Sequence, residues 1–461
     1  MTPHRSATSF SQALSLFRDR RLLWIFLLGF SSGFPWVLIG SAMSAWLQEA
    51  GQTRTAIGFF GSVFIVYALN FLWAPLLDRL QVPLLRRWLG QRRSWIVLMQ
   101  WIIAGAAVAI GLTDPGVSLF WSSLLALLIA TASATQDIAV DAYRIEIIGS
   151  DESEKIPHAA AITTSGWWTG FSVPGAMALY LSDLPGMEWS MIYALLGGLM
   201  LLLSWLVWRM PEPESQRVER QHAAERHYEE ELGEYSAVAG ESRQRMAWWG
   251  VTVVEPFAEF FRRNGVKLAL SILAFIFLFK LGEAFLGRMS IVFYKEIGFS
   301  NSEIATYSKL VGWWVTIIFS LLAGLFNARF GIVRGLMIGG IAMASTNLLF
   351  SWLSAVGPDT TIFALAVVLD NFTSSFATVT FVTFISYLTS RAYTATQYAL
   401  MASLGNLGRT TVASFSGVMV DGLGGDWFIF FLLTSLMVIP ALLLLWRIGH
   451  HLHISTPTQE T

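Results

Sequence analysis

Residues 133–144 read Ser-Ala-Thr-Gln-Asp-Ile-Ala-Val-Asp-Ala-Tyr-Arg, and they lie inside an apolar run that covers residues 117–148. The charged residues Asp137, Asp141 and Arg144 follow one another at i, i+4 and i+7, which places them on one face of a helix. A charge at the centre of a membrane helix costs about 2.5–3.5 kcal/mol on the insertion scale. Each of the three therefore needs a partner, water or a function.

The composition indicates a membrane protein. Of the 461 residues, 54% are hydrophobic and 13% are charged, whereas a soluble domain has about 25% charged residues. The net charge of −1 gives no reason to expect a nucleic acid partner. The chain has no cysteine, which excludes disulfides and thiolate metal sites, and we expect no metal and no cofactor.

Twelve apolar runs have the length of about 20 residues that a membrane-spanning helix needs, which predicts an all-α membrane protein. They cover residues 22–48, 55–78, 95–112, 118–148, 158–182, 189–209, 267–296, 302–328, 332–356, 361–390, 395–420 and 426–447. The first run exceeds the 7–15 residues of a signal-peptide core, so we interpret it as an uncleaved first helix.

Lysine and arginine predict the orientation, because they concentrate in cytoplasmic loops. One set of connections between the runs holds most of them. The opposite set holds little beyond Arg54, Lys295 and Lys309. We therefore expect both the N- and C-termini in the cytoplasm, as an even number of spans requires.

A stretch of mixed charge with few large apolar residues separates the sixth and seventh runs, which is typical of a solvated, partly helical linker. The predicted parts are a cytoplasmic segment 1–21, a six-helix bundle 22–209, a charged cytoplasmic linker 210–266, a second six-helix bundle 267–447 and a cytoplasmic tail 448–461. The end of the linker, residues 256–263, is either an interfacial helix or the start of the seventh span.

A repeated loop pattern supports the division into two halves. Ala-Pro-Leu-Leu-Asp-Arg at 74–79 follows the second run, and Gly-Leu-Phe-Asn-Ala-Arg-Phe-Gly at 324–331 follows the eighth. Both resemble the loop signature of the major facilitator superfamily, small-x-x-x-Asp-Arg-x-Gly-x-x-Arg. That resemblance implies two bundles that face a shared cavity with substrate near the midplane. Asp78, Arg79 and Arg329 are the candidates for a cytoplasmic gate.

In the fourth run, two uses of the charged stripe remain open. In one, Asp141 and Arg144 form a structural pair at the cytoplasmic gate, together with Arg79, and Asp137 has no partner within its own helix. In the other, Asp137 or Asp141 serves transport, as a proton or substrate site. Glu146 points the opposite way near the end of the run, where we expect it to reach solvent.

Further charges lie in three runs of the second half. Lys280 and Glu283 in the seventh run are three residues apart and can pair. Asp370 and Asn371 occupy the tenth run, the positional counterpart of the fourth. Arg409 lies near the middle of the eleventh run without a local acid, which suits an anionic substrate group or a carboxylate on another helix such as Asp370.

Two pairs of adjacent tryptophans, Trp167-Trp168 and Trp313-Trp314, lie in the fifth and eighth runs. Neighbours on a helix point in different directions, so at most one of each pair faces the interior. We interpret them as packing or lipid contacts, with a platform for stacking sugars as the alternative.

Three motifs resemble one family. Residues 133–144 are similar to Ser-Ala-Ser-Gln-Asp-Ile-x-x-Asp-Ala of the AmpG-like muropeptide permeases. Lys-Leu-Gly-Glu-Ala-Phe at 280–285 resembles their Lys-Leu-Gly-Asp-Ala-Phe. Ala-Thr-Gln-Tyr-Ala-Leu at 395–400, followed by Gly-Arg at 408–409, resembles their Ala-Thr-Gln-x-Ala-Leu and Gly-Arg. The resemblance covers residues 29–424.

The resemblance implies a proton-driven carrier of the bacterial inner membrane. It would import anhydro-muropeptides (GlcNAc-anhydro-MurNAc, with or without peptide) from the periplasm for cell-wall recycling, and through that flux influence β-lactamase induction. Its partners would be the sugar-peptide, protons and the lipid bilayer. The family-signature positions are Asp137, Asp141, Lys280 and Arg409, with Glu283 in place of an Asp and Arg144 in place of a Lys.

Two alternatives remain open. The first is a siderophore or acyl-CoA-type carrier of the same superfamily. The second is a membrane-embedded enzyme or sensor. Six of the seven histidines fall in the tails or the linker, which gives an enzyme little to work with. The sequence also lacks the Gly-x-x-x-x-Gly-Lys-Ser/Thr loop, so we do not expect direct drive by ATP.

Overall fold

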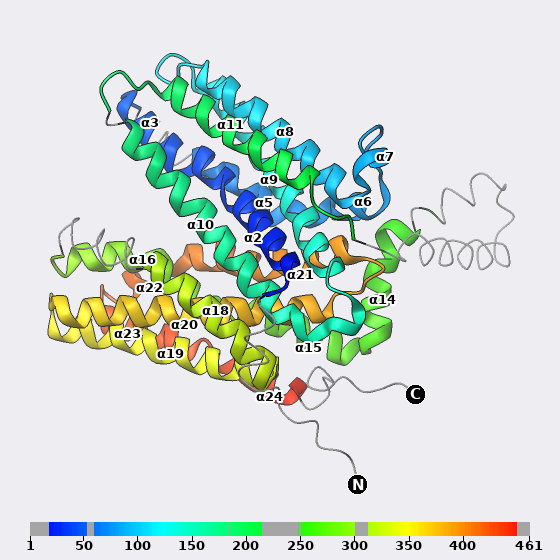
Figure 1. The fold of residues 1–461 in the computed structure, drawn as a ribbon. Coiled ribbons are helices and arrows are strands. Elements are labelled where there is room, and N and C mark those ends of the chain that lie inside the picture. Colours follow the sequence, from blue (N-terminus) through cyan, green and yellow to red (C-terminus); the bar gives the residue numbers. More distant parts are fainter. Residues whose placement is uncertain are drawn as a thin grey trace, which may run out of the picture.

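The computed structural model describes residues 18–52, 60–182, 184–213, 248, 250–299 and 312–449. Within these segments every regular element is a helix, as the composition predicts. Figure 1 shows the helices of the N-terminal half (blue to green) on one side and most of those of the C-terminal half (bright green through yellow to red) on the other. The chain therefore folds as two groups of long helices.

The N-terminal half begins with a helix that continues through a π-helical turn. Its elements are α2 (Arg20–Gly33), η2 (Val37–Ser41), α3 (Ala42–Glu49), η3 (Gly61–Ile65), α5 (Val66–Leu69), η4 (Asn70–Leu72), α6 (Ala74–Arg79), α7 (Arg86–Leu89), α8 (Arg92–Gly111), α9 (Leu119–Glu146), η5 (Ser150–Lys155), α10 (Ile156–Ser182) and α11 (Trp189–Trp208).

The C-terminal half follows the linker, of which residues 214–247 and 249 lie outside the described part. Its elements are η6 (Gly250–Val254), α14 (Glu255–Asn264), α15 (Val266–Leu278), α16 (Leu281–Glu296), α18 (Gly312–Phe330), α19 (Ile332–Val356), α20 (Thr360–Leu388), α21 (Thr394–Thr411), η8 (Val412–Phe415), α22 (Ser416–Gly422), α23 (Trp427–Leu436) and α24 (Ile439–Gly449). Gly265, with φ of 74°, separates α14 from α15. The end of the linker is thus a helix of its own rather than the start of the seventh run.

Nine helices of the described segments are long and apolar enough to cross a membrane. The other three predicted runs correspond to α10 and to two regions that are divided into shorter pieces, η3 to α6 and α21 to α22. Several long helices also contain breaks, such as the one between α15 and α16. Hydropathy alone does not reveal these breaks, because they lie within continuous apolar runs.

Two of the contacts between the halves involve α10 and α21. Ala160 and Ala161 of α10 pack with Ala323 of α18 and with α20. Ala395 and Ala399 of α21 join a buried cluster that is otherwise formed by the N-terminal half. Helix α21 therefore reaches across the boundary and packs against α6 and α9.

Glycines bring α2 and α10 unusually close together. A Cβ on Gly33 would lie 2.0 Å from the carbonyl oxygen of Trp167, and one on Gly170 would lie 2.0 Å from that of Phe30. Small residues at four-residue spacing let membrane helices approach until their backbones touch, and Gly29 and Gly166 complete the two small-xxx-small pairs. This contact holds the tryptophan-bearing part of α10 against α2.

The substitution Gly33→Ala tests this contact. We expect it to lower the stability by about 1–3 kcal/mol, because the new methyl group forces the two backbones apart. The measurement is the midpoint of thermal unfolding in detergent. Gly198→Ala in α11 is the matched control, since its Cβ meets nothing within 4 Å. A midpoint for Gly33→Ala equal to that of Gly198→Ala would contradict the close contact.

Candidate functional site

Three charged residues form a buried cluster at the end of the helices that is predicted to be cytoplasmic. Nη2 of Arg92 lies 2.7 Å from Oδ1 of Asp78 and 2.6 Å from Oε1 of Glu146. The side chains of all three are at most 4% exposed. One guanidinium thus joins the second, third and fourth runs. The expectation that Glu146 reaches solvent was wrong, because α8 covers it and Arg92 neutralises it.

Asp78 also binds the other half of the protein. Its Oδ2 accepts hydrogen bonds from the backbone N–H of Thr396 at 2.9 Å and from the Thr396 hydroxyl at 2.8 Å. Its Oδ1 accepts from the backbone N–H of Ala395 at 3.3 Å. N–H groups in the first turn of a helix have no carbonyl partner within that helix, and the helix dipole favours a carboxylate there. We call Asp78, Arg92, Glu146 and Thr396 the latch.

Other hydrogen bonds cross between the halves near the latch. Arg391 donates to the carbonyl oxygens of Ile145 at 2.6 Å and Ile148 at 2.5 Å. The hydroxyl of Tyr387 donates to the carbonyl of Ser153. Together with the latch, these contacts hold the two halves closed at this end.

A second charge cluster ties the start of α2 to η5. Arg21 lies 2.6 Å and Lys155 2.5 Å from the Glu152 carboxylate, and Lys155 also lies 2.9 Å from Asp19. The hydrogen bond from Arg21 and then that from Lys155 lower the pKa of Glu152 from 4.5 to about 2. Because the pKa of Glu152 is lower in the folded protein, its ion pairs stabilise the fold at pH values above the unfolded-state pKa of 4.5. This contribution is lost as the pH falls from 4.5 towards 2.

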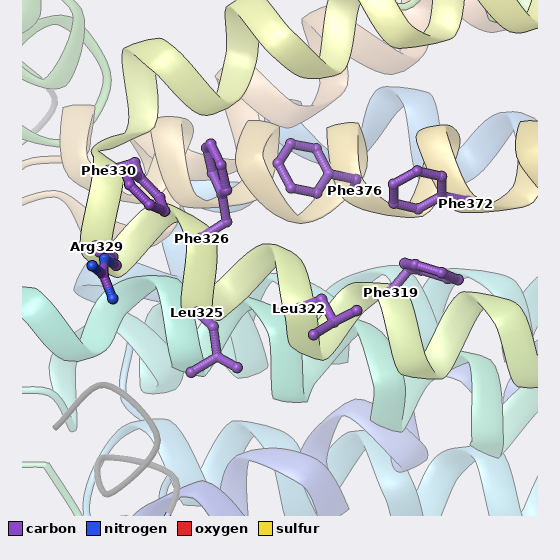
Figure 2. Close-up of a pocket in the computed structure, with 8 residues that line it drawn as sticks. All are labelled: Phe319, Leu322, Leu325, Phe326, Arg329, Phe330, Phe372 and Phe376. Carbon is purple, nitrogen blue, oxygen red and sulfur yellow. The ribbon is translucent and has the colours of Figure 1, made fainter. Parts of the chain in front are cut away.

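The other two predicted gate residues, Arg79 and Arg329, are not part of the latch. The guanidinium of Arg79 lies 5.5 Å from the centre of the Trp248 ring. Arg329 lies 5.3 Å from the Phe330 ring and borders an otherwise apolar pocket of about 280 Å³ between α18 and α20. Figure 2 shows Arg329 at one end of this pocket, with the side chains of Phe372 and Phe376 towards the other. Apart from Arg329, the residues that line this pocket are apolar, so the pocket does not resemble a polar binding site.

On α9, Asp141 and Arg144 form the ion pair that one of the two predicted arrangements contains. Nη2 of Arg144 lies 3.2 Å from Oδ1 of Asp141. Arg144 also donates to the Ser386 hydroxyl at 3.1 Å and lies 5.3 Å from the centre of the Tyr398 ring. Its side chain is only 1% exposed. Arg144 therefore links its own helix to two helices of the other half.

Asp137 has a different environment. Its Oδ1 is buried and accepts no hydrogen bond within the described segments. The hydroxyls of Ser32 and Tyr67 are also buried and without a hydrogen bond there, although Tyr67 and Asp137 are close enough to interact electrostatically. Its charged neighbour is Asp141, one helical turn away. Asp137 is thus the acid of this stripe whose charge the described residues compensate least.

In the second half, Lys280 occupies the break between α15 and α16. Its Nζ lies 3.0 Å from Oε2 of Glu283 and donates to the Thr378 hydroxyl at 2.5 Å. The Ser374 hydroxyl donates to the other oxygen of Glu283. Lys280 is only 8% exposed, and the break in the helix lets its ammonium group and Glu283 face α20.

Asp370 continues this polar stripe along α20. It lies one turn before Ser374 and is close enough to Glu283 and Lys280 to interact electrostatically. The Thr346 hydroxyl lies 3.4 Å from its Oδ1. The structure therefore brings Lys280, Glu283 and Asp370 together, with two acids for one base.

Two predicted site residues are not part of that group as described. The amide of Asn371 donates to the carbonyl of Val367 in its own helix, at 2.8 Å. Arg409 lies in α21, but its side chain is outside the described residues. The pairing of Arg409 with Asp370 stays a prediction.

Sequence reasoning missed an aromatic cluster in the N-terminal half. The ring centre of Trp36 lies 4.6 Å from Phe64, 4.8 Å from Tyr67 and 5.5 Å from Trp167. Trp168, the neighbour of Trp167, is exposed. As predicted, only one of the two adjacent tryptophans points inwards. Single aromatics in apolar runs give no signal that they converge, because four separate elements carry these rings.

Comparison with known proteins gives a consistent assignment. A family model described as Major Facilitator Superfamily matches residues 25–313. The chain is 33% identical over 439 residues to a protein named as transporter AmpG 4 from Rickettsia conorii, covering 95% of this chain and 99% of that one. It is 30% identical over 436 residues to the anhydromuropeptide permease of Escherichia coli K12, covering 94% of this chain and 81% of that one.

Solved structures show the same fold at low identity. The proton:xylose symporter XylE superposes with a TM-score of 0.67 at 14% identity, over 95% of this chain and 96% of that one. The human organic anion transporter MFSD10 superposes with a TM-score of 0.63 at 16% identity, over 92% and 99%.

The latch predicts the effect of Asp78→Asn. Loss of the carboxylate leaves Arg92 with one acid and weakens the hold on α21, and breaking a buried ion pair costs about 3–5 kcal/mol. We expect the halves to separate at this end. The chain has no native cysteine, so spin labels on Arg87→Cys and Arg334→Cys report that separation by electron–electron double resonance.

Asp426→Asn is the matched control, because Asp426 only caps the first turn of α23. It should leave the distance distribution unchanged. An unchanged distribution in Asp78→Asn would show that the latch does not hold the halves together.

Proposed function

The chain belongs to the AmpG-type permeases of the major facilitator superfamily and is a multi-pass membrane transporter rather than an enzyme, and we propose that it imports anhydro-muropeptides together with protons. The substrate class is GlcNAc-anhydro-MurNAc, with or without its peptide. The direction is from the periplasm to the cytoplasm across the bacterial inner membrane. The products would feed cell-wall recycling and, through it, β-lactamase induction.

The proposed topology has twelve spans. In addition to the nine long apolar helices, α10 and the two divided regions, η3 to α6 and α21 to α22, would cross the bilayer. Two six-helix bundles then lie on either side of the linker, and both termini are cytoplasmic. The latch is the cytoplasmic gate of this arrangement, which would make the described conformation closed to the cytoplasm.

The observation that carries the proposal is the burial of ionisable groups at two places among the helices. Lys280, Glu283 and Asp370 lie close together in the C-terminal half, and Asp137 has Asp141 as its charged neighbour among the described residues. Ionisable groups in a membrane interior are energetically costly, and those that occur usually form pairs or take part in transport. Relatives named as AmpG and as an anhydromuropeptide permease support the sugar-peptide over other cargo.

The residues divide the work as follows. Asp137 takes up and releases the proton, because protonation removes a charge that nothing in the described segments neutralises. Lys280 is the first cation proposed to bind the carboxylates of the lactyl or peptide group. Arg409 is the second cation proposed for that end. Asp141 and Arg144 couple this site to the latch, since Arg144 contacts α20 and α21.

Uptake into proteoliposomes tests the proposal. With an imposed inward proton gradient, labelled GlcNAc-anhydro-MurNAc should accumulate, and a protonophore should abolish the accumulation. A ferric siderophore and an acyl-CoA are the competing cargoes. Accumulation of either in place of the muropeptide would transfer the assignment to that carrier class, and accumulation that survives the protonophore would contradict proton coupling.

Two substitutions separate the proton from the substrate. Asp137→Asn should lower proton-driven accumulation at least about tenfold but leave counterflow exchange within about twofold, because exchange needs no net proton movement. Lys280→Ala should lower both, since the substrate loses its cation.

Lys295→Ala is the control for Lys280→Ala, because Lys295 lies near the end of α16, the helix that begins directly after Lys280, but is exposed. It should retain both activities. Full proton-driven accumulation by Asp137→Asn would remove Asp137 from the coupling mechanism.

A further inference from the structure

We propose that Trp36, Phe64, Tyr67 and Trp167, which we call the aromatic corner, bind one sugar ring of the substrate in the N-terminal half. This inference rests on the proposed function and adds the place where the carbohydrate is held. The ring would stack on the Trp36 and Trp167 faces. Its hydroxyl and amide groups would bond to polar atoms at the edge of the corner.

The corner is assembled from three parts of the N-terminal half. Trp36 lies between α2 and the π-helical turn η2, Phe64 and Tyr67 lie on η3 and α5, and Trp167 lies on α10. The glycine contact between α2 and α10 holds Trp167 against Trp36, because Gly33 meets the Trp167 backbone directly. Trp36, Phe64 and Trp167 are partly exposed, whereas Tyr67 is buried. These three residues therefore keep part of their surface exposed, although Phe171 stacks against the Trp167 ring.

Polar atoms without partners surround these rings. Nε1 of Trp36 and the hydroxyls of Tyr67 and Ser133 are buried and form no hydrogen bond of good geometry within the described segments, although the two hydroxyls lie close to each other. Tyr67 and Ser133 are each at most 8% exposed. Buried donors and acceptors are nearly always paired in proteins. Several unpaired ones beside a set of open ring faces point to a ligand that supplies the partners.

The chemistry of these atoms selects the class of ligand. Aromatic rings with a polar edge suit a molecule that has one apolar face and a polar rim, and the C–H face and hydroxyl rim of a pyranose have that form. An aromatic cage beside a carboxylate also suits an organic cation. However, the indole N–H of Trp36 only donates, and a cation offers no acceptor for it. A neutral sugar offers an acceptor to the indole N–H and hydrogen-bond partners to the Tyr67 and Ser133 hydroxyls.

The corner also lies in the opposite half from Lys280. A sugar-peptide carries its neutral rings and its carboxylates in different parts of the molecule. The N-terminal half would hold the ring, and the C-terminal half would hold the anionic end. A ligand bound at both places would bridge the halves, which suits a carrier that must move them against each other.

The experiment measures binding of labelled GlcNAc-anhydro-MurNAc without peptide to the full-length protein in detergent, by equilibrium dialysis. Trp36→Leu and Trp167→Leu should each raise the Kd at least about tenfold, and Trp36→Phe, which keeps the ring but loses the N–H, about threefold. Trp352→Leu is the matched control. Its indole is exposed and lies on α19 in the other half of the protein, and its Kd should stay within about twofold.

Every outcome bears on the inference. Unchanged Kd values in Trp36→Leu and Trp167→Leu overturn it, while unimpaired uptake by the unmodified protein would still support the proposed function. Displacement of the sugar by tetraethylammonium identifies a cation cage and also overturns it. If the unmodified protein neither binds nor takes up the disaccharide, both proposals fail. Should either Leu variant unfold, judged by its thermal midpoint, Trp36→Phe decides the matter.

Discussion

The carboxylate of Asp78 is the interaction on which the closed arrangement depends. It bonds to Arg92 in its own half and to the first turn of α21 in the other half. One group thus serves as ion-pair partner and as helix cap between the bundles. Because the latch is buried, its bonds are not weakened by water, and loss of one partner alone would leave another charge buried and uncompensated, which is strongly unfavourable. The halves therefore separate here as a unit or not at all.

Helix α21 extends the influence of the latch into the membrane interior. Its first turn meets Asp78, and Tyr398, one turn further on, meets the Arg144 guanidinium. Arg144 is paired with Asp141, the neighbour of Asp137. A series of contacts therefore connects the latch to Asp141, which interacts electrostatically with Asp137. In the proposed cycle, a change of charge at Asp137 alters the field at Asp141 and Arg144, and through them the contact with α21.

Much of the fold and part of the site could be predicted from the sequence. Apolar runs of sufficient length identify the long helices, and the spacing of Asp141 and Arg144, or of Lys280 and Glu283, predicts pairs that the structure contains. Such pairs are local, since both partners lie within one turn of helix. Glu146 was misjudged because its partner, Arg92, is 54 residues away. Nothing local to α9 reveals which helix covers that face.

The sequence by itself determined that the chain is a helical membrane protein of two related halves, and which helices carry charge. Hydropathy and helical spacing depend on residues that are close together in the sequence, so they can be recognised without the tertiary structure. Only the tertiary structure decided that Asp78 caps α21, that Ser374 and Thr378 meet Glu283 and Lys280, and that Trp36 and Trp167 converge beside Asp137. Each of these joins residues from different helices, and their meeting depends on packing, above all on the glycines that let α2 and α10 touch.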